Sequence, residues 1–286
     1  MSKSNMLLGL AKGKVGDLVF YRDGGEQRTR TRVVPKNPRT IAQMSQRVKI
    51  ANVSGIFRAA ASVLRDSFVN RPTNQSGFNA FASGAISLAP YLTAEQAKAG
   101  ICVPQPAMVS KGTLPPLNYR TLEAEDTYTQ GLAIQGADSV PATIGGYSSV
   151  IMNNYPSVVV GDEITFVTLK FQRADGVALD VAMAAATPII ASFKVDPSDS
   201  RNLEDLGYVF TDDAIAYTGN NVIDDASIVM QFVIHSHVSA DGKLDVSTQY
   251  AHLSDNAQTI YDNYRTSQAL NAAVESYKAS ATALLR

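Results

Sequence analysis

Near the N-terminus, hydrophobic and polar positions follow the pattern of a β-hairpin. Residues 15–21 are rich in β-prone side chains, and residues 23–25 (Asp-Gly-Gly) form a strong turn signal. Residues 27–34 read as the return strand, which two prolines then end. An isolated hairpin is marginally stable in water, so we expect it to rest on the following helix or on another subunit. Alternation along the return strand places three cations on one face, namely Arg28, Arg30 and Arg32.

A long amphipathic helix is predicted after this hairpin. Thr40 and Gln43 have the spacing of a capping box, in which each side chain hydrogen-bonds to the backbone amide of the other residue. Apolar residues then recur at helical spacing as far as Phe68, and Pro72 ends the pattern. Gly55 lies within the helix, where we expect either a bend or close packing.

Two shorter helices are predicted before the pattern changes. Residues 74–88 place apolar side chains at positions i, i+3, i+4 and i+7, which is the spacing of a helix face. Thr93 and Gln96 repeat the capping-box spacing for a short helix, and Gly100 is expected to end it.

From residue 101 onward, short alternating segments are separated by turn residues, which is typical of antiparallel β structure. The strongest predicted strands are residues 158–160, 164–171, 177–183, 189–195, 228–238 and 244–252. The last two, joined across Ala-Asp-Gly at residues 240–242, form the clearest hairpin. These segments predict a sandwich-like body.

The chain is predicted to end in one helix over residues 254–285, with Ser254 as its N-cap. Such a helix is about 45 Å long at 1.5 Å per residue. The predicted fold class is therefore α+β. Its parts are a basic hairpin arm (residues 1–38), a helical module (39–100), a β-rich domain (101–253) and the C-terminal helix (254–286).

Charge is distributed unevenly along the 286-residue chain, although its net charge is only −1. Residues 1–72 hold 14 Lys and Arg against 4 Asp and Glu, a net charge of +10, and residues 73–286 hold 11 against 22, a net charge of −11. The basic end suits nucleic acid or the acidic body of a neighbouring copy. Aromatic rings are sparse in the hairpin, which favours the protein partner over stacked bases. The residues expected to carry this interaction are Lys12, Lys14, Arg22, Arg28, Arg30, Arg32, Lys36 and Arg39.

Candidate catalytic and metal-binding residues are few. Phosphate-binding glycine loops and the Gly-x-Ser-x-Gly nucleophile motif are both missing from the sequence. His235 and His237 lie two apart on one predicted strand, with His252 on its partner, so either a metal site or a polar stripe fits them. The acidic pairs at residues 212–213 and 224–225 fit solvated loops better than a carboxylate dyad or a calcium site.

The one cysteine excludes an internal disulfide and any multi-cysteine metal site. Cys102 lies in an apolar run, which predicts a buried, inert thiol. The apolar run at residues 6–11 is shorter than the core of a signal peptide, and the stretch at 181–193 is too short to span a bilayer. We therefore expect no enzymatic activity, no cofactor, no membrane partner and no classical export signal.

Four motifs occur in order within residues 9–118. They are Gly13-Lys14-Val15-Gly16; Asn37-Pro38-Arg39-Thr40 followed by Gln43 and Arg47; Phe78-Asn79; and Ser110-Lys111-Gly112-Thr113-Leu114. As an ordered set they resemble an uncharacterised protein family of gut bacteria and their phages. The resemblance implies no known catalytic activity and supplies no active-site residue, and the phage members of the family imply a structural role in the virion.

The sequence thus favours a non-enzymatic structural or assembly protein. A component of a phage virion, in a ring, neck or capsid-associated position, is the expected function, with other copies of the chain and other virion proteins as partners. The alternative is a nucleic-acid-binding accessory protein that uses the basic arm in the cytoplasm.

Overall fold

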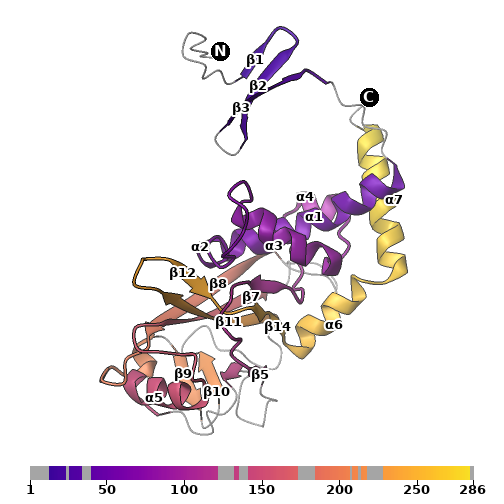
Figure 1. Cartoon of the computed structure of the whole chain (residues 1–286). Helices are drawn as coiled ribbons and strands as arrows, with labels where there is room; N and C mark the ends of the chain where they lie inside the picture. Colours follow the sequence, from indigo (N-terminus) through magenta and orange to yellow (C-terminus); the bar gives the residue numbers. More distant parts are fainter. Residues whose placement is uncertain are drawn as a thin grey trace.

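A computed structural model describes residues 13–23, 26–33, 40–121, 132–134, 141–172, 184–206, 208–211, 214–217 and 228–283. Figure 1 shows a central sheet with helices on one side, a smaller sheet and a helix on the other, and an N-terminal arm that lies apart from both. The predicted α+β class is confirmed, because an N-terminal hairpin, antiparallel sheets and a helical C-terminus are all present.

The central sheet is antiparallel and has the strand order β12-β11-β7-β8, with β14 also paired to β11. Its strands are β7 (Glu163–Gln172), β8 (Ala184–Lys194), β11 (Ile228–Val238), β12 (Leu244–Val246) and β14 (His252–Leu253). The predicted strands 164–171, 189–195 and 228–238 are confirmed within β7, β8 and β11, and the hairpin from β11 to β12 is confirmed by their pairing.

Strand β11 is buried on both faces. Ile228, Met230 and Phe232 point into a core shared with the helical layer, whereas Val229 and Val233 point into a second core on the opposite side. This follows from the two-residue period of a strand, which sends alternate side chains to opposite faces. A strand of this kind needs a covering layer on each side.

The helical layer consists of α1 (Ile41–Ala59), α2 (Ala61–Leu64), α3 (Gly77–Ala85), the 3₁₀ turn η2 (Ile86–Leu88) and α4 (Ala94–Lys98). Thr40 caps α1, since its hydroxyl accepts from the Gln43 amide at 3.4 Å. The capping box of Thr93 and Gln96 is complete, with both hydrogen bonds present, and Gly100 adopts φ +76° as the terminating residue. The predicted start and end of the helix at residues 93–100 are therefore confirmed.

The predicted long helix is interrupted at Ala60. Its backbone has φ −112° and ψ 27°, outside the helical region, so α1 ends there and the short α2 follows. Gly55, in contrast, lies within an unbroken helix. A Cβ atom at Gly55 would stand 2.9 Å from the Cys102 sulfur, so this glycine serves close packing and not a bend.

A buried polar group joins α1 to the segment that follows α4. The Asn52 side chain is fully buried; its Oδ1 accepts from the Val103 amide at 2.7 Å, and its Nδ2 donates to the Val103 carbonyl and to Gln105 Oε1, both at 2.9 Å. Gln105 in turn donates to the Ala85 carbonyl at the end of α3. Each group is satisfied, which is the condition under which buried polar side chains stabilise a fold.

The opposite face of the central sheet is covered by helix α5 (Ile144–Asn154) and by a sheet of strand order β5-β6-β10-β9. These strands are β5 (Tyr119–Thr121), β6 (Leu132–Ile134), β9 (Tyr208–Thr211) and β10 (Ala214–Tyr217), with the 3₁₀ turn η3 (Leu203–Leu206) before β9. Tyr147 and Ile151 of α5 and Ile134 of β6 pack in the second core.

The sequence pattern did not predict helix α5. Glycines at its start make it a poor helix by propensity, but Gly145 is required there because a Cβ atom would stand 2.5 Å from the Pro197 carbonyl oxygen. The amides of Ile144 and Gly145 donate to the carbonyls of Arg201 and Asp199, at 2.9 and 2.8 Å. A distant loop therefore caps the first turn of this helix.

Two predicted strands differ in the structure. Residues 158–160 lead into a turn closed by Asp162, which accepts from the Val159 amide, and are not a strand. Residues 244–252 are divided, because β13 (Gln249–Tyr250) leaves the central sheet to pair with β4 (Met108–Ser110) before β14 returns to β11. The predicted strand at 177–183 lies outside the described residues.

The prediction of a single C-terminal helix is wrong, because the structure divides this segment into two helices. Helix α6 (Asp255–Asn263) has Ser254 as N-cap, as predicted, but ends at Tyr264, and α7 (Ser267–Ala283) begins after it. The Thr266 hydroxyl accepts from the Ala269 amide and so restarts the helix. Because of this break α7 can pack on α1, where Ala273 and Val274 contact Met44 and Val48.

The ranges 39–100 and 101–253 share one hydrophobic core. Ile56 and Phe81 of the helical layer belong to the same cluster as Leu169 of β7 and Phe232 of β11. The helices therefore complete the sheet, since neither layer alone would bury the apolar face that it presents.

Replacing Phe232 by alanine tests this arrangement. The side chain is completely buried at the centre of β11, so Phe232→Ala should lower the free energy of unfolding by about 3–5 kcal/mol in urea titrations. Val238→Ala, on the same strand but 63% exposed, is the control and should change it by less than about 0.5 kcal/mol. Similar losses in both variants would contradict the burial of this face of β11 in the core shared with the helices.

Candidate interaction surfaces

The arm is an antiparallel sheet of β1 (Gly13–Val15), β2 (Leu18–Asp23) and β3 (Glu26–Thr31), with β2 in the centre. Strands β2 and β3 confirm the predicted hairpin, with Asp23 paired to Glu26 across the connection, and β1 adds a strand that the sequence pattern did not separate from β2. None of the described arm side chains belongs to the three hydrophobic clusters of the body.

The strand register divides the arm into two faces. Lys14 pairs with Val19 and Val19 with Arg30, while Tyr21 pairs with Arg28, so these residues share one face. We call it the cationic face. The residues on the other side, the neutral face, are Val15, Leu18, Phe20, Thr29 and Thr31, with Arg22 at its edge.

The predicted interaction residues are distributed as follows. Arg28 and Arg30 lie in β3, and Arg32 follows it with its backbone amide donating to the Asp17 carbonyl at 2.6 Å. By alternation Arg32 continues the cationic face, whereas Arg22 lies on the neutral face. Lys12, Lys36 and Arg39 lie outside the described residues.

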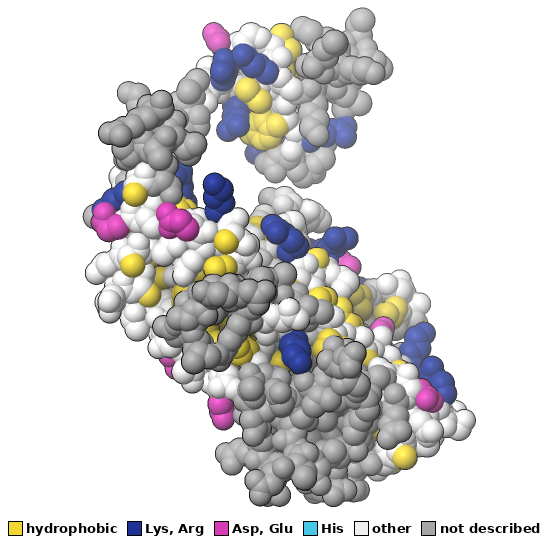
Figure 2. Space-filling view, turned by 180° about the vertical axis from the view of Figure 1, so that it is seen from behind, with side chains coloured by type: hydrophobic (Ala, Val, Ile, Leu, Met, Phe, Trp, Pro, Cys, Tyr) yellow, Lys and Arg dark blue, Asp and Glu magenta, His cyan; other side chains and the backbone are white. Residues whose placement is uncertain are grey.

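The neutral face carries exposed apolar side chains. Val15 is 42% exposed and Leu18 is 47% exposed, and Val33 beyond the strand is 73% exposed. Figure 2 shows the arm at the top of the view, with hydrophobic and basic side chains next to each other at its surface. The arm thus has no core of its own within the described residues, as expected for an element that rests on another surface.

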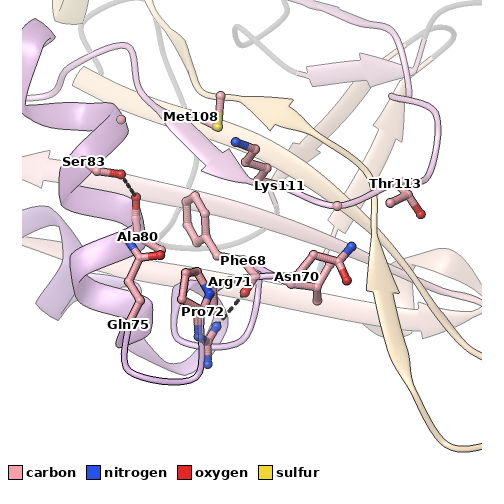
Figure 3. Close-up of a pocket in the computed structure, with 13 residues that line it drawn as sticks. Phe68, Asn70, Arg71, Pro72, Gln75, Ala80, Ser83, Met108, Lys111 and Thr113 are labelled. Carbon is pink, nitrogen blue, oxygen red and sulfur yellow. Dashed lines mark hydrogen bonds between the residues drawn. The ribbon is translucent and has the colours of Figure 1, made fainter. Parts of the chain in front are cut away.

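A pocket of about 430 Å³ lies between the loop after α2, helix α3 and the end of β4 (Figure 3). Phe68 and Met108 contribute apolar walls, and Arg71 and Lys111 are the two cations that line it. The Arg71 guanidinium donates to the Phe68 carbonyl at 2.6 Å, so one of its N–H groups is already bonded to a backbone oxygen. Asn70, also in the wall, has φ +58°, a left-handed conformation that asparagine tolerates.

His235 and His237 converge on one buried carboxylate. Asp162 is 1% exposed; its Oδ2 lies 2.7 Å from His235 Nε2 and its Oδ1 lies 2.6 Å from His237 Nδ1. The Nδ1 atom of His235 is buried and has no hydrogen-bond partner among the described residues. Of the two ring nitrogens of His235, Nε2 is therefore the one placed to hydrogen-bond with the carboxylate.

This cluster ties the turn before β7 to the end of β11. Asp162 was not predicted as a partner because it lies 73 residues before His235, and its Gly-Asp sequence reads as a turn. His252 is separate: it lies on β14 opposite Gln231, and burial lowers its pKa. Within the described residues no group of three or more His, Cys, Asp or Glu side chains is arranged to hold a metal ion.

The acidic pairs at 212–213 and 224–225 lie outside the described residues. Cys102 is buried against α1, as predicted for an inert thiol, and burial raises its pKa to about 12. In the described part of the chain, no helix combines the length and the apolar composition needed to cross a membrane.

Replacing Asp162 by asparagine tests the cluster. An amide offers one acceptor atom in place of two, so one imidazole N–H loses its partner, and the free energy of unfolding should fall by about 1–3 kcal/mol. Urea titration measures this loss. Asp205→Asn, at an exposed position, is the matched control and should stay within about 0.5 kcal/mol of the parent protein. A loss no larger than the control would show that the cluster adds no stability.

The Cys102 thiol should be unreactive in the folded protein. With its pKa raised to about 12, almost none of it is thiolate at pH 8, and it is also inaccessible. A colourimetric thiol reagent should label it only along the urea unfolding transition. An added cysteine at exposed Ala99 should react at once under native conditions. Fast labelling of the parent protein without denaturant would contradict the burial of Cys102.

Comparisons with known proteins give no precedent for these surfaces. The chain matches no protein-family model, no curated protein and no solved structure. The functional interpretation therefore depends on what the described residues can do. The arm is the strongest candidate, because it combines exposed apolar side chains, a segregated set of cations and the absence of packing against the body clusters.

Proposed function

We propose that this chain is a non-enzymatic structural protein of a phage particle, joined to neighbouring copies by its N-terminal arm. A ring, neck or capsid-associated position suits such a protein, with other virion proteins as further partners. The observation that carries the proposal is the neutral face of the arm, whose Val15 and Leu18 side chains are 42% and 47% exposed.

The energetics of the arm favour a protein partner for this face. Complete burial of a valine or leucine side chain contributes about 1.5–3 kcal/mol, and the described arm offers no second layer that could supply it. The threonines of the same face are uncharged, and Arg22 lies at its edge, so a partner can cover the centre of the face without burying a charge. A protein surface that meets this face would stabilise both the arm and the contact.

The distribution of charge also supports contact between copies. The first 72 residues carry a net charge of +10 and the rest a net charge of −11, which steers the basic end of one copy toward the acidic part of another and acts on the rate of association more than on the strength of the contact. A contact of this kind joins different surfaces on the two copies. Such heterologous contacts close into rings when the rotation between copies allows it.

The resemblance of residues 9–118 to a family of gut bacteria and their phages supports the virion as the location. Ring and neck components of a particle are repeated copies held by mutual contacts, which matches an arm that has no core of its own. The proposal assigns no catalytic residue and no cofactor to the chain.

The double substitution Val15→Ser and Leu18→Ser tests the arm as the joining element. Native mass measurement should show the parent protein as a defined oligomer. The variant should associate at least tenfold more weakly, because two apolar side chains no longer gain from burial. Lys14→Gln combined with Arg30→Gln changes the opposite face and is the matched control, which should keep the oligomer.

A parent protein that is strictly monomeric at every concentration and missing from purified particles would overturn the proposal. Mass spectrometry of purified phage particles tests the location separately, since co-purification in a fixed ratio to other virion proteins is expected there.

A further inference from the structure

The cationic face of the arm has an ordered geometry. Lys14 on β1 and Arg28 and Arg30 on β3 lie on the two outer strands, and Val19 and Tyr21 lie between them on β2. Neighbouring strands are about 4.8 Å apart, so the lysine on one side and the row of two arginines on the other are separated by about 10 Å. The result is an apolar and aromatic strip bordered on both sides by positive charge.

Acidic residues lie at the ends of this face and leave its centre positive. Glu26 lies 3.6 Å from the Arg28 guanidinium, with the two side chains 78% and 52% exposed. An exposed pair of this kind is worth at most about 1 kcal/mol, so a phosphate can replace the carboxylate at little cost. Asp17 lies at the other end, where its backbone carbonyl accepts from the Arg32 backbone amide at 2.6 Å.

The Tyr21 ring at the centre of this face helps to position one of the cations. The Arg30 guanidinium lies over the Tyr21 ring, 5.6 Å from its centroid. Such a cation–π contact holds the arginine above the sheet, and the Arg30 side chain with its five N–H donors belongs to an exposed residue. Arginine presents these donors in a planar fork that matches the oxygens of a phosphate.

We propose that the cationic face binds the sugar-phosphate backbone of nucleic acid. A lysine on one side of a ring and a row of arginines on the other match a continuous chain of phosphates better than the scattered carboxylates of a protein surface, because every phosphate carries a charge at a regular interval. This face lies opposite the neutral face, so an arm docked through Val15 and Leu18 still presents Lys14 and Arg28 outward. The two surfaces belong to one arm but serve different partners.

The test uses the full-length protein and two fluorescent DNA probes, one single-stranded and one double-stranded, in anisotropy titrations at about 50 mM and 200 mM salt. The variant Lys14→Gln, Arg28→Gln and Arg30→Gln should bind at least tenfold more weakly at the lower salt. Each cation that contacts a phosphate contributes about 0.9 to the salt slope on duplex and about 0.7 on a single strand, so the slope should fall by about 2–3. The probe that binds more tightly identifies the form of nucleic acid.

The matched control is the neutral-face variant Val15→Ser and Leu18→Ser, which should retain DNA binding per arm while its association weakens. Oligomeric mass serves as the folding check for the triple variant and should be unchanged. No binding of the parent protein to either probe at low salt, or unchanged binding by the triple variant, would overturn the proposal. So would competition by polyglutamate equal to that by DNA, since the face would then recognise acidic protein. These outcomes leave the assembly proposal standing, because that proposal is tested by the oligomeric mass of the parent protein and of the neutral-face variant and by the presence of the protein in purified particles.

Discussion

The burial of β11 on both faces is the constraint on which the rest of this structure depends. Residues 228–235 of this strand are all buried, and their side chains alternate between two cores. A sheet with two apolar faces cannot remain open to water on either side, so the helices before residue 100 and the α5 region are both required. The helical module is therefore part of the same folding unit as the sheet.

Three polar contacts hold these layers in register. Asn52 joins α1 to the segment at Val103, and Asp162 joins the turn before β7 to the two histidines of β11. The third is the capping of α5 by carbonyls of a distant loop. Asn52, Asp162 and the backbone amides of Ile144 and Gly145 are buried with partners, so these contacts favour one arrangement over others that would leave those groups unsatisfied. They connect segments of the chain that lie far apart in sequence.

The arm differs from the body in that apolar side chains on one of its faces are exposed. In the body both faces of β11 meet another layer, whereas the arm exposes Val15 and Leu18 on one face and arranges Lys14, Arg28 and Arg30 on the other. A sheet this small has too little area to bury for stability by itself. Both faces of the arm have a role under the two proposals: the neutral face contacts a neighbouring copy, and the cationic face binds a polyanion. The body is then the part of each copy that folds around its own core.

The sequence by itself determined the elements whose signals are local: the hairpin with its arginines on alternate positions, the caps at Thr40, Thr93 and Ser254, and the long strand at 228–238. Periodicity and hydrogen bonds to residues three positions away are sufficient for these. Only the tertiary structure decided the break at Ala60, the division of the C-terminal helix, the formation of α5 and the convergence of two histidines on Asp162. The reason is physical: the start of α5, the C-terminal break and the histidine cluster involve contacts between residues far apart in sequence, such as the Tyr91 amide donating to the Tyr264 carbonyl at 3.0 Å, and such contacts can reverse a local preference. The arm combines both situations. Alternation along one strand predicted that Arg28, Arg30 and Arg32 share a face, but the neutral face opposite them follows only from the register of all three strands.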